Sequence, residues 1–158
     1  MSRTDDVYTL PADLPVPEDD GACDHLSGKS LPSIGLRSTR GALADLSKLA
    51  GGIVVYTCPR MGRRDQGLPA GWNSIPGARG CTPQSCAFRD HRAELASLGT
   101  RVFGPGTRST DYRKELAERL HLPFDVPSDR EIEKVFYPDF PPDKGTDDVI
   151  DWLKTHPD

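Results

Sequence analysis

Residues 80–90 read GCTPQSCAFRD, and this stretch decides how the chain is interpreted. Thr82 can cap a helix, and Pro83 suits a first helical turn because the backbone N–H that it lacks would have no partner there. Gly99 can end a helix because glycine adopts the left-handed conformation without strain. The sequence therefore predicts one helix over residues 82–98.

Cys81 would lie at the N-terminus of this helix or one residue before it. The unpaired backbone N–H groups and the positive end of the helix dipole favour an anion at that point, so they stabilise a thiolate. A thiolate is the form of cysteine that attacks a peroxide O–O bond, and the product is a sulfenic acid. The same N–H groups can hold the peroxide oxygens and stabilise the charge that develops on them.

Cys86 follows five residues after Cys81. In an intact helix, Cα atoms five residues apart lie about 8 to 9 Å from each other, which exceeds the limit of about 7 Å for a disulfide. A bridge would therefore require the first turn to unwind, or Cys81 to lie outside the helix, and Pro83 makes unwinding easy. The spacing alone leaves open that these are two unrelated thiols, one of them in the core.

The sequence on either side of this helix predicts an α/β domain. Residues 53–57, Ile-Val-Val-Tyr-Thr, follow two glycines and are typical of a strand buried on both faces. Alternating strands and helices indicate a sheet covered by helices. The other predicted elements are strands near 33–36, 42–43, 101–103 and 131–137, a helix from Ser109 or Thr110 to Leu120, and a helix from Thr146 that buries Val149, Ile150, Trp152 and Leu153.

Two regions are predicted to be irregular. Residues 1–30 contain three prolines and an acidic run, so we expect an extended N-terminal arm ahead of a domain over residues 31–158. Residues 61–79 are rich in Gly, Arg and Pro and indicate a long surface loop. Long loops in compact domains are usually functional or disordered.

The composition excludes several classes of protein. The 158 residues fit one domain, and a net charge of −4 without a basic, aromatic cluster argues against a nucleic-acid surface. No apolar run approaches 18 residues and the N-terminus does not read as a signal peptide, so we expect a soluble, cytoplasmic protein without membrane contact. Four cysteines then indicate reactive or buried thiols. Cys23 and His25 lack the second ligand pair of a zinc site, so neither a metal nor another cofactor is expected.

Residues 80–90, with residues 94–95 and 98–99, resemble the pattern G-C-T-x-x-x-C-x-F-R-D-x-x-x-E-L-x-x-L-G of the Q-type, bacterioferritin-comigratory peroxiredoxins. The resemblance extends from about residue 33 to residue 129 and resumes near residue 131. It implies a thioredoxin-like α/β fold with a central mixed sheet and helices on both faces.

The same resemblance implies a thiol-dependent peroxidase that reduces hydrogen peroxide or organic hydroperoxides. Cys81 would become a sulfenic acid and condense with Cys86 to a disulfide. Thioredoxin or a similar dithiol reductant would then restore both thiols. A monomer or weak dimer is expected.

The resemblance also implies supporting residues around the reactive thiol. A proline after the central strand would open the active-site loop and shield the thiolate. A helix arginine would support the site, unless it only forms an ion pair with Asp90 or Glu94. Cys58 is either simply buried or a second resolving cysteine. The supporting residues are Pro59, Gly80, Thr82 and Arg89.

The sequence departs from the family pattern in two places. Ala78 stands where the family has a threonine whose hydroxyl touches the peroxide, and Ser74 or Thr82 could substitute. The family's strand arginine has no counterpart, because residues 128–129 pass almost directly to the segment that begins at Arg130. The chain therefore looks internally shortened. The candidates for a replacement cation, expected near the carboxyl edge of the sheet, are Arg101, Arg108 and Arg130.

These departures leave a second function open. A degenerate peroxiredoxin would sense or bind through Cys81 with little turnover, and the missing arginine favours this alternative. The intact segment over residues 80–90 favours the enzyme. A general thiol–disulfide exchange protein would normally show Cys-x-x-Cys, which the sequence lacks.

Overall fold

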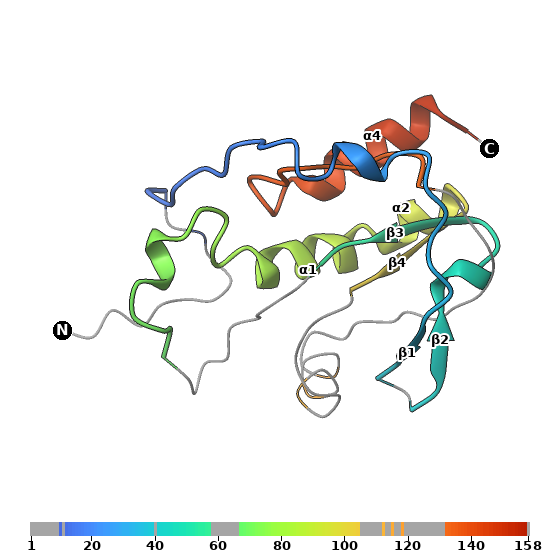
Figure 1. Ribbon diagram of the computed structural model, residues 1–158, viewed down its shortest axis with the longest axis horizontal. Coiled ribbons are helices and arrows are strands. Elements are labelled where there is room, and N and C mark those ends of the chain that lie inside the picture. The colour runs from blue at the N-terminus through green and yellow to red at the C-terminus, as the bar shows by residue number, and fades with distance from the viewer. Residues whose placement is uncertain are drawn as a thin grey trace.

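The computed structural model describes residues 10, 12–39, 41–57, 67–104, 112, 115, 118 and 132–157 (Figure 1). Several sequence-predicted features lie outside these residues. They are Cys58, Pro59, Arg108, Arg130 and most of the helix expected from Ser109 or Thr110.

Two pairs of strands form the described sheet structure. Strand β3 (Gly52–Val55) pairs in parallel with β4 (Thr100–Phe103), and strand β1 (Gly35–Arg37) pairs antiparallel with β2 (Leu43–Asp45). A strand is therefore confirmed at each of the four predicted places before residue 104. The β3–β4 pair lies beside the helices, whereas the β1–β2 hairpin projects away from them (Figure 1).

The strand predicted over residues 131–137 is wrong, because residues 132–137 form no strand. This segment runs beside the N-terminal region instead of a strand of either sheet. Ile132 exchanges two backbone hydrogen bonds of 2.8 Å with Gly28 and Lys29.

The single helix predicted over residues 82–98 is also wrong. Helix α1 (Cys81–Asp90) and helix α2 (Arg92–Ser97) are separated by His91, whose φ of −88° and ψ of 8° lie outside the helical range. Gly99 follows α2 with a φ of 70°, which confirms the predicted end. The predicted C-terminal helix is confirmed as α4 (Gly145–Thr155).

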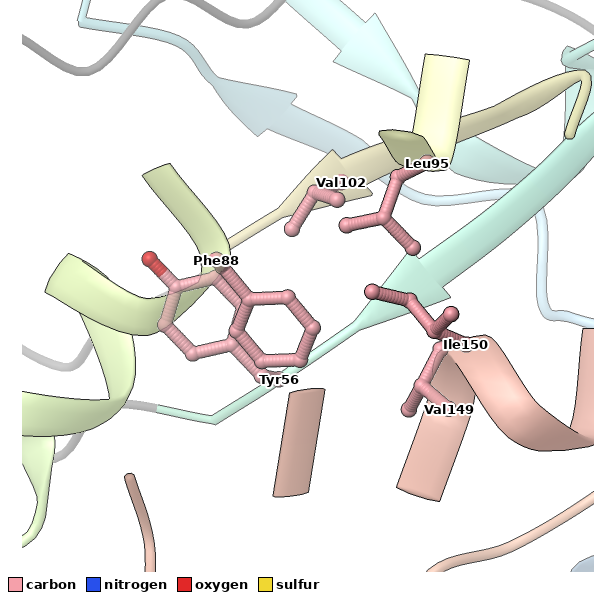
Figure 2. Close-up of a cluster of buried hydrophobic side chains, with 6 residues drawn as sticks. All are labelled: Tyr56, Phe88, Leu95, Val102, Val149 and Ile150. Atoms are coloured by element: carbon pink, nitrogen blue, oxygen red, sulfur yellow. The ribbon is translucent and has the colours of Figure 1, made fainter. Parts of the chain in front are cut away.

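Among the described residues, the core joins strands β3 and β4 to helices α1, α2 and α4 (Figure 2). Tyr56 directly follows β3, and its ring stacks on Phe88 of α1 with centroids 4.7 Å apart. Burying each large apolar side chain contributes about 1.5–3 kcal/mol. Cys81 and Cys86 both pack against the core from its edge. The buried cluster consists of Tyr56, Phe88, Leu95, Val102, Val149 and Ile150.

The described part of residues 1–30 packs along the segment that precedes α4 (Figure 1). Leu14 is buried, and the carbonyl of Pro15 accepts a hydrogen bond from the Gly77 N–H at 3.4 Å. The Tyr137 hydroxyl donates to Asp20 at 3.1 Å. A boundary at residues 30 and 31 stays a prediction. Among the described residues, no helix has the length and apolar character needed to cross a membrane.

Candidate active site around Cys81 and Cys86

Cys81 is the first residue of α1, and Gly80 is the N-cap. Thr82 lies inside the first turn, almost fully buried, so the expectation that Thr82 caps the helix is wrong. The N-cap has no side-chain hydrogen bond because it is a glycine. A Cβ atom at Gly80 would lie 2.6 Å from Cγ of Pro142, so only glycine fits at this close approach.

The first turn of α1 is fully formed. The Gln84 N–H donates to the Gly80 carbonyl at 3.0 Å, and the Ser85 hydroxyl donates to the Cys81 carbonyl at 2.8 Å. Cys81 and Cys86 are present as thiols, and both are half-buried on this one helix. Their Cα atoms are therefore held at the helical spacing of about 8 to 9 Å. The helix must open at its start before the two sulfurs can bond.

The electrostatic setting of Cys81 suits a thiolate. The first turn of α1 contains no acidic residue of its own, and the positive end of the helix dipole favours a negative charge there. Arg79, two residues before Cys81, is half-buried and has a φ of 69°. A positive φ is uncommon for a residue other than glycine. The sequence reasoning missed Arg79, and only its nearness to Cys81 could have drawn attention to it.

Two of the arginines that the sequence suggested, Arg89 and Arg101, lie within the described residues. Arg89 forms an ion pair of 2.7 Å with Asp90, which is one of the two roles expected for it. Arg101 donates to the carbonyl of Ala50, which precedes β3, so its guanidinium lies at the amino ends of the strands and not at their carboxyl ends. The expectation that placed Arg101 at the carboxyl edge is wrong.

Residue 78 cannot supply the hydroxyl expected from the family threonine, because alanine carries no hydroxyl. Ala78 is buried. The exposed Ser74 hydroxyl donates to the Gly71 carbonyl at 2.7 Å. Thr82, adjacent to Cys81, therefore remains the better candidate of the two that the sequence offered.

Cys86 opens onto a hollow of about 300 Å³ on the outer side of α1. One end of the hollow is formed by His91, whose ring lies 3.3 Å from Glu94 and 3.7 Å from Asp147. Its lining consists of Pro83, Cys86, Ala87, Asp90, His91 and Asp143.

Asp139 is a further residue that the sequence reasoning missed. Its carboxylate accepts a hydrogen bond from the Gln84 side chain on the first turn of α1. Burial raises the pKa of Asp139 to about 6, the charge of Asp148 acts in the same direction, and the Gln84 hydrogen bond partly opposes them. No local sequence signal marks this residue, because Asp139 and Gln84 are 55 positions apart.

No family model matches the chain. The chain is 32% identical over 103 residues to the chloroplastic peroxiredoxin Q of Sedum lineare, and equally to those of Oryza sativa subsp. japonica and Populus jackii. The match covers 65% of this chain and 47% of the Sedum protein. The chain thus spans about half the length of the curated relatives it matches.

Two solved structures are similar over most of the chain. Peroxidoxin BcpB from Mycobacterium tuberculosis matches with a TM-score of 0.63 and 18% identity, covering 82% of this chain and 97% of that one. Xanthomonas campestris peroxiredoxin Q matches with a TM-score of 0.50 and 15% identity, covering 93% and 99%. These likenesses confirm the thioredoxin-like α/β fold.

Proposed function

We propose that this chain, which belongs to the Q-type peroxiredoxins by its sequence relationship, is a thiol-dependent peroxidase that reacts through Cys81. The observation that carries the proposal is the placement of Cys81 as first residue of α1, with no carboxylate in that turn. Hydrogen peroxide and organic hydroperoxides are the proposed substrates.

In the first step, the Cys81 thiolate attacks one peroxide oxygen and the O–O bond breaks. The attacked oxygen stays on sulfur as a sulfenic acid, and water or an alcohol leaves after gaining a proton. The N–H groups at the start of α1 point toward the place where the peroxide oxygens carry charge in the transition state. Thr82 and Arg79 are the proposed supporting groups nearest to Cys81 in the chain.

In the second step, the first turn of α1 opens and the Cys86 sulfur attacks the Cys81 sulfur. The new S–S bond forms as the S–O bond breaks, and water leaves. A dithiol such as thioredoxin then returns two electrons, with the hollow beside Cys86 as the proposed point of entry. The oligomeric state and the cytoplasmic location stay predictions, as do the supporting roles of Gly80, Arg89 and Pro59.

We do not favour the degenerate alternative, because the reactive segment is intact and its first turn is fully formed. One stoichiometric equivalent of hydrogen peroxide, followed by thiol trapping and mass spectrometry, distinguishes the two functions. We expect loss of two hydrogens within one chain, located at Cys81 and Cys86. Repeated turnover with a dithiol reductant would establish the enzyme. A single oxidation that no dithiol reverses would instead support a sensor.

The matched controls are Cys86→Ser and Cys23→Ser. Cys86→Ser should stop at the sulfenic acid and over-oxidise with more peroxide, because the second thiol is missing. Cys23→Ser should behave as the native chain does, because Cys23 lies on the N-terminal segment. A dimer linked through Cys81 would contradict the intrachain step.

A further inference from the structure

Asp139 joins two helices from a segment that the proposed chemistry does not use. One carboxylate oxygen accepts the hydrogen bond from Gln84 on α1. The carboxylate also lies directly against Gly145, the first residue of α4, where no Cβ atom could fit. Helices α1 and α4 contact each other, and α4 begins close after this segment (Figure 1). One half-buried carboxylate therefore holds the start of α1 onto the start of α4.

The residue that Asp139 holds lies between the two cysteines. Gln84 is only 8% exposed, and it follows Cys81 by three residues and precedes Cys86 by two. The same segment contacts the helix a second time, because Pro142 packs on Gly80. Residues 139–142 thus touch the first turn of α1 on both sides of Cys81. Opening that turn moves Gln84 away from Asp139.

We infer that Asp139 is a positioning residue, acting through Gln84, that sets how readily the first turn of α1 opens and so how fast Cys86 reaches an oxidised Cys81. The inference rests on the proposed function, since it concerns the second step of that reaction. In that step the S–O bond of the sulfenic acid breaks, the S–S bond forms, and water leaves.

The charge of Asp139 gives this contact a pH dependence. In the closed helix the pKa of Asp139 is raised to about 6, first by burial and then by Asp148 on α4. Lys144 and Asp147, on the same turn as Asp148, pair with each other at 3.6 Å, and Gln84 on α1 is uncharged. An opened segment would return Asp139 to water, where its pKa falls to the ordinary value. Raising the pH through about 6 therefore favours opening.

The experiment uses the full chain and three variants at position 139 or on α4. Asp139→Ala removes the contact, Asp139→Asn keeps an oxygen for Gln84 but cannot ionise, and Asp151→Asn removes an exposed charge from α4 as a matched control. Cys81 is oxidised with one equivalent of hydrogen peroxide, and disulfide formation is followed separately from sulfenic acid formation between pH 5 and 7.5.

Between pH 5 and 7.5, the rate of disulfide formation should increase by a factor about ten times larger in the native chain than in Asp139→Asn, because only the native carboxylate ionises. Asp139→Ala should bridge several-fold faster than the native chain at pH 5, and Asp151→Asn should match the native chain. The inference fails if Asp139→Asn retains the native pH profile, or if Asp139→Ala bridges at the native rate.

Amide hydrogen exchange of the reduced protein keeps the inference testable without any peroxide chemistry. Exchange over residues 82–86 should be faster in Asp139→Ala than in the native chain, and it should rise with pH in the native chain beyond the intrinsic rate. Unchanged exchange in that variant would overturn the inference. If Cys81 is not oxidised in any variant, the proposed function fails, and the exchange result still decides the role of Asp139.

Discussion

The starts of helices α1 and α4 lie close together, yet they differ in the charges placed at the positive end of the helix dipole. The first turn of α4 carries Asp147 and Asp148, and Asp139 lies against its first residue. The first turn of α1 carries no acidic residue and begins with Cys81. Carboxylates within the first turn of α4 neutralise its positive end, whereas the first turn of α1 has none of its own and meets a carboxylate where Gln84 binds Asp139. A cysteine at the start of a helix is favoured as a thiolate when that first turn carries no carboxylate.

Removing the thiol from the start of α1 should produce the largest effect. We expect Cys81→Ser to lose peroxide reduction by a factor of about 100 or more, because a hydroxyl at a helix start is not ionised at neutral pH. Peroxide consumption in the presence of a dithiol measures this loss. Cys23→Ser is the control, and equal activity in both variants would show that Cys81 is not the reactive thiol.

The helix start alone should make a slow enzyme. The family resemblance predicts that two supporting groups are absent, a strand arginine and the threonine expected at position 78, and one lost donor at such a site costs about 10²–10³ in rate. We therefore expect Cys81 oxidation about 100-fold slower, or more, than in the Populus jackii peroxiredoxin Q under the same single-turnover conditions. A rate equal to that of the relative would show that Arg79 or another cation replaces the missing arginine.

Placing a carboxylate in the first turn of α1 would make it resemble α4. Pro83 is buried in the first turn of α1 and lines the hollow, so a longer side chain there would extend into the hollow. Pro83→Glu should slow Cys81 oxidation about two- to fivefold at neutral pH, because a nearby negative charge worth about 0.3–1 kcal/mol raises the pKa of the thiol. Pro83→Gln is the uncharged control of the same size, and stopped-flow oxidation measures both. Equal rates in the two variants would mean that dipole charge does not set the reactivity.

Removing the buried charge at the start of α4 should change stability with pH. The pKa of Asp139 in the folded chain is about 6, above its ordinary value of 3.8, so the native chain loses stability as the pH rises from about 4 to 6. Asp139→Asn should therefore be more stable than the native chain at pH 7.5, by about 1 kcal/mol after discounting for partial exposure. Denaturant unfolding at pH 4 and 7.5 measures the difference. A larger gain at pH 4 than at pH 7.5 would contradict the sign.

The smallest effect is expected from the exposed carboxylates of α4. Asp147→Asn removes a negative charge that interacts favourably with the positive end of the helix dipole. It also removes the ionic contacts of Asp147 with Lys144 and His91. Thermal unfolding should show a loss of about 0.3–1 kcal/mol, and Cys81 oxidation should not change. A slower oxidation would mean that the two helix starts are coupled through charge as well as through packing.

The local features of the molecule can be predicted from short stretches of sequence. The β-branched run before Tyr56, the glycine after Leu98 and the acidic first turn of α4 each have a conformational reason that lies within a few residues. The position of Cys81 at a helix start followed from the same local signals. Local signals also misled, because Thr82 and Pro83 suited a cap and a first position, whereas the helix begins one residue before Thr82.

The distant groups that meet at the start of α1 are brought there by the folding of the whole chain. Pro142 excludes any side chain from Gly80, Asp139 binds Gln84, and Ala50 holds Arg101 away from the thiol. Ile132 likewise pairs with the N-terminal segment and not with a sheet. Hydrogen-bond and packing partners that are far apart in the chain leave no periodicity or spacing in the sequence. The position of Cys81 could therefore be predicted from the sequence, whereas the contacts that hold its helix closed could be identified only in the folded structure.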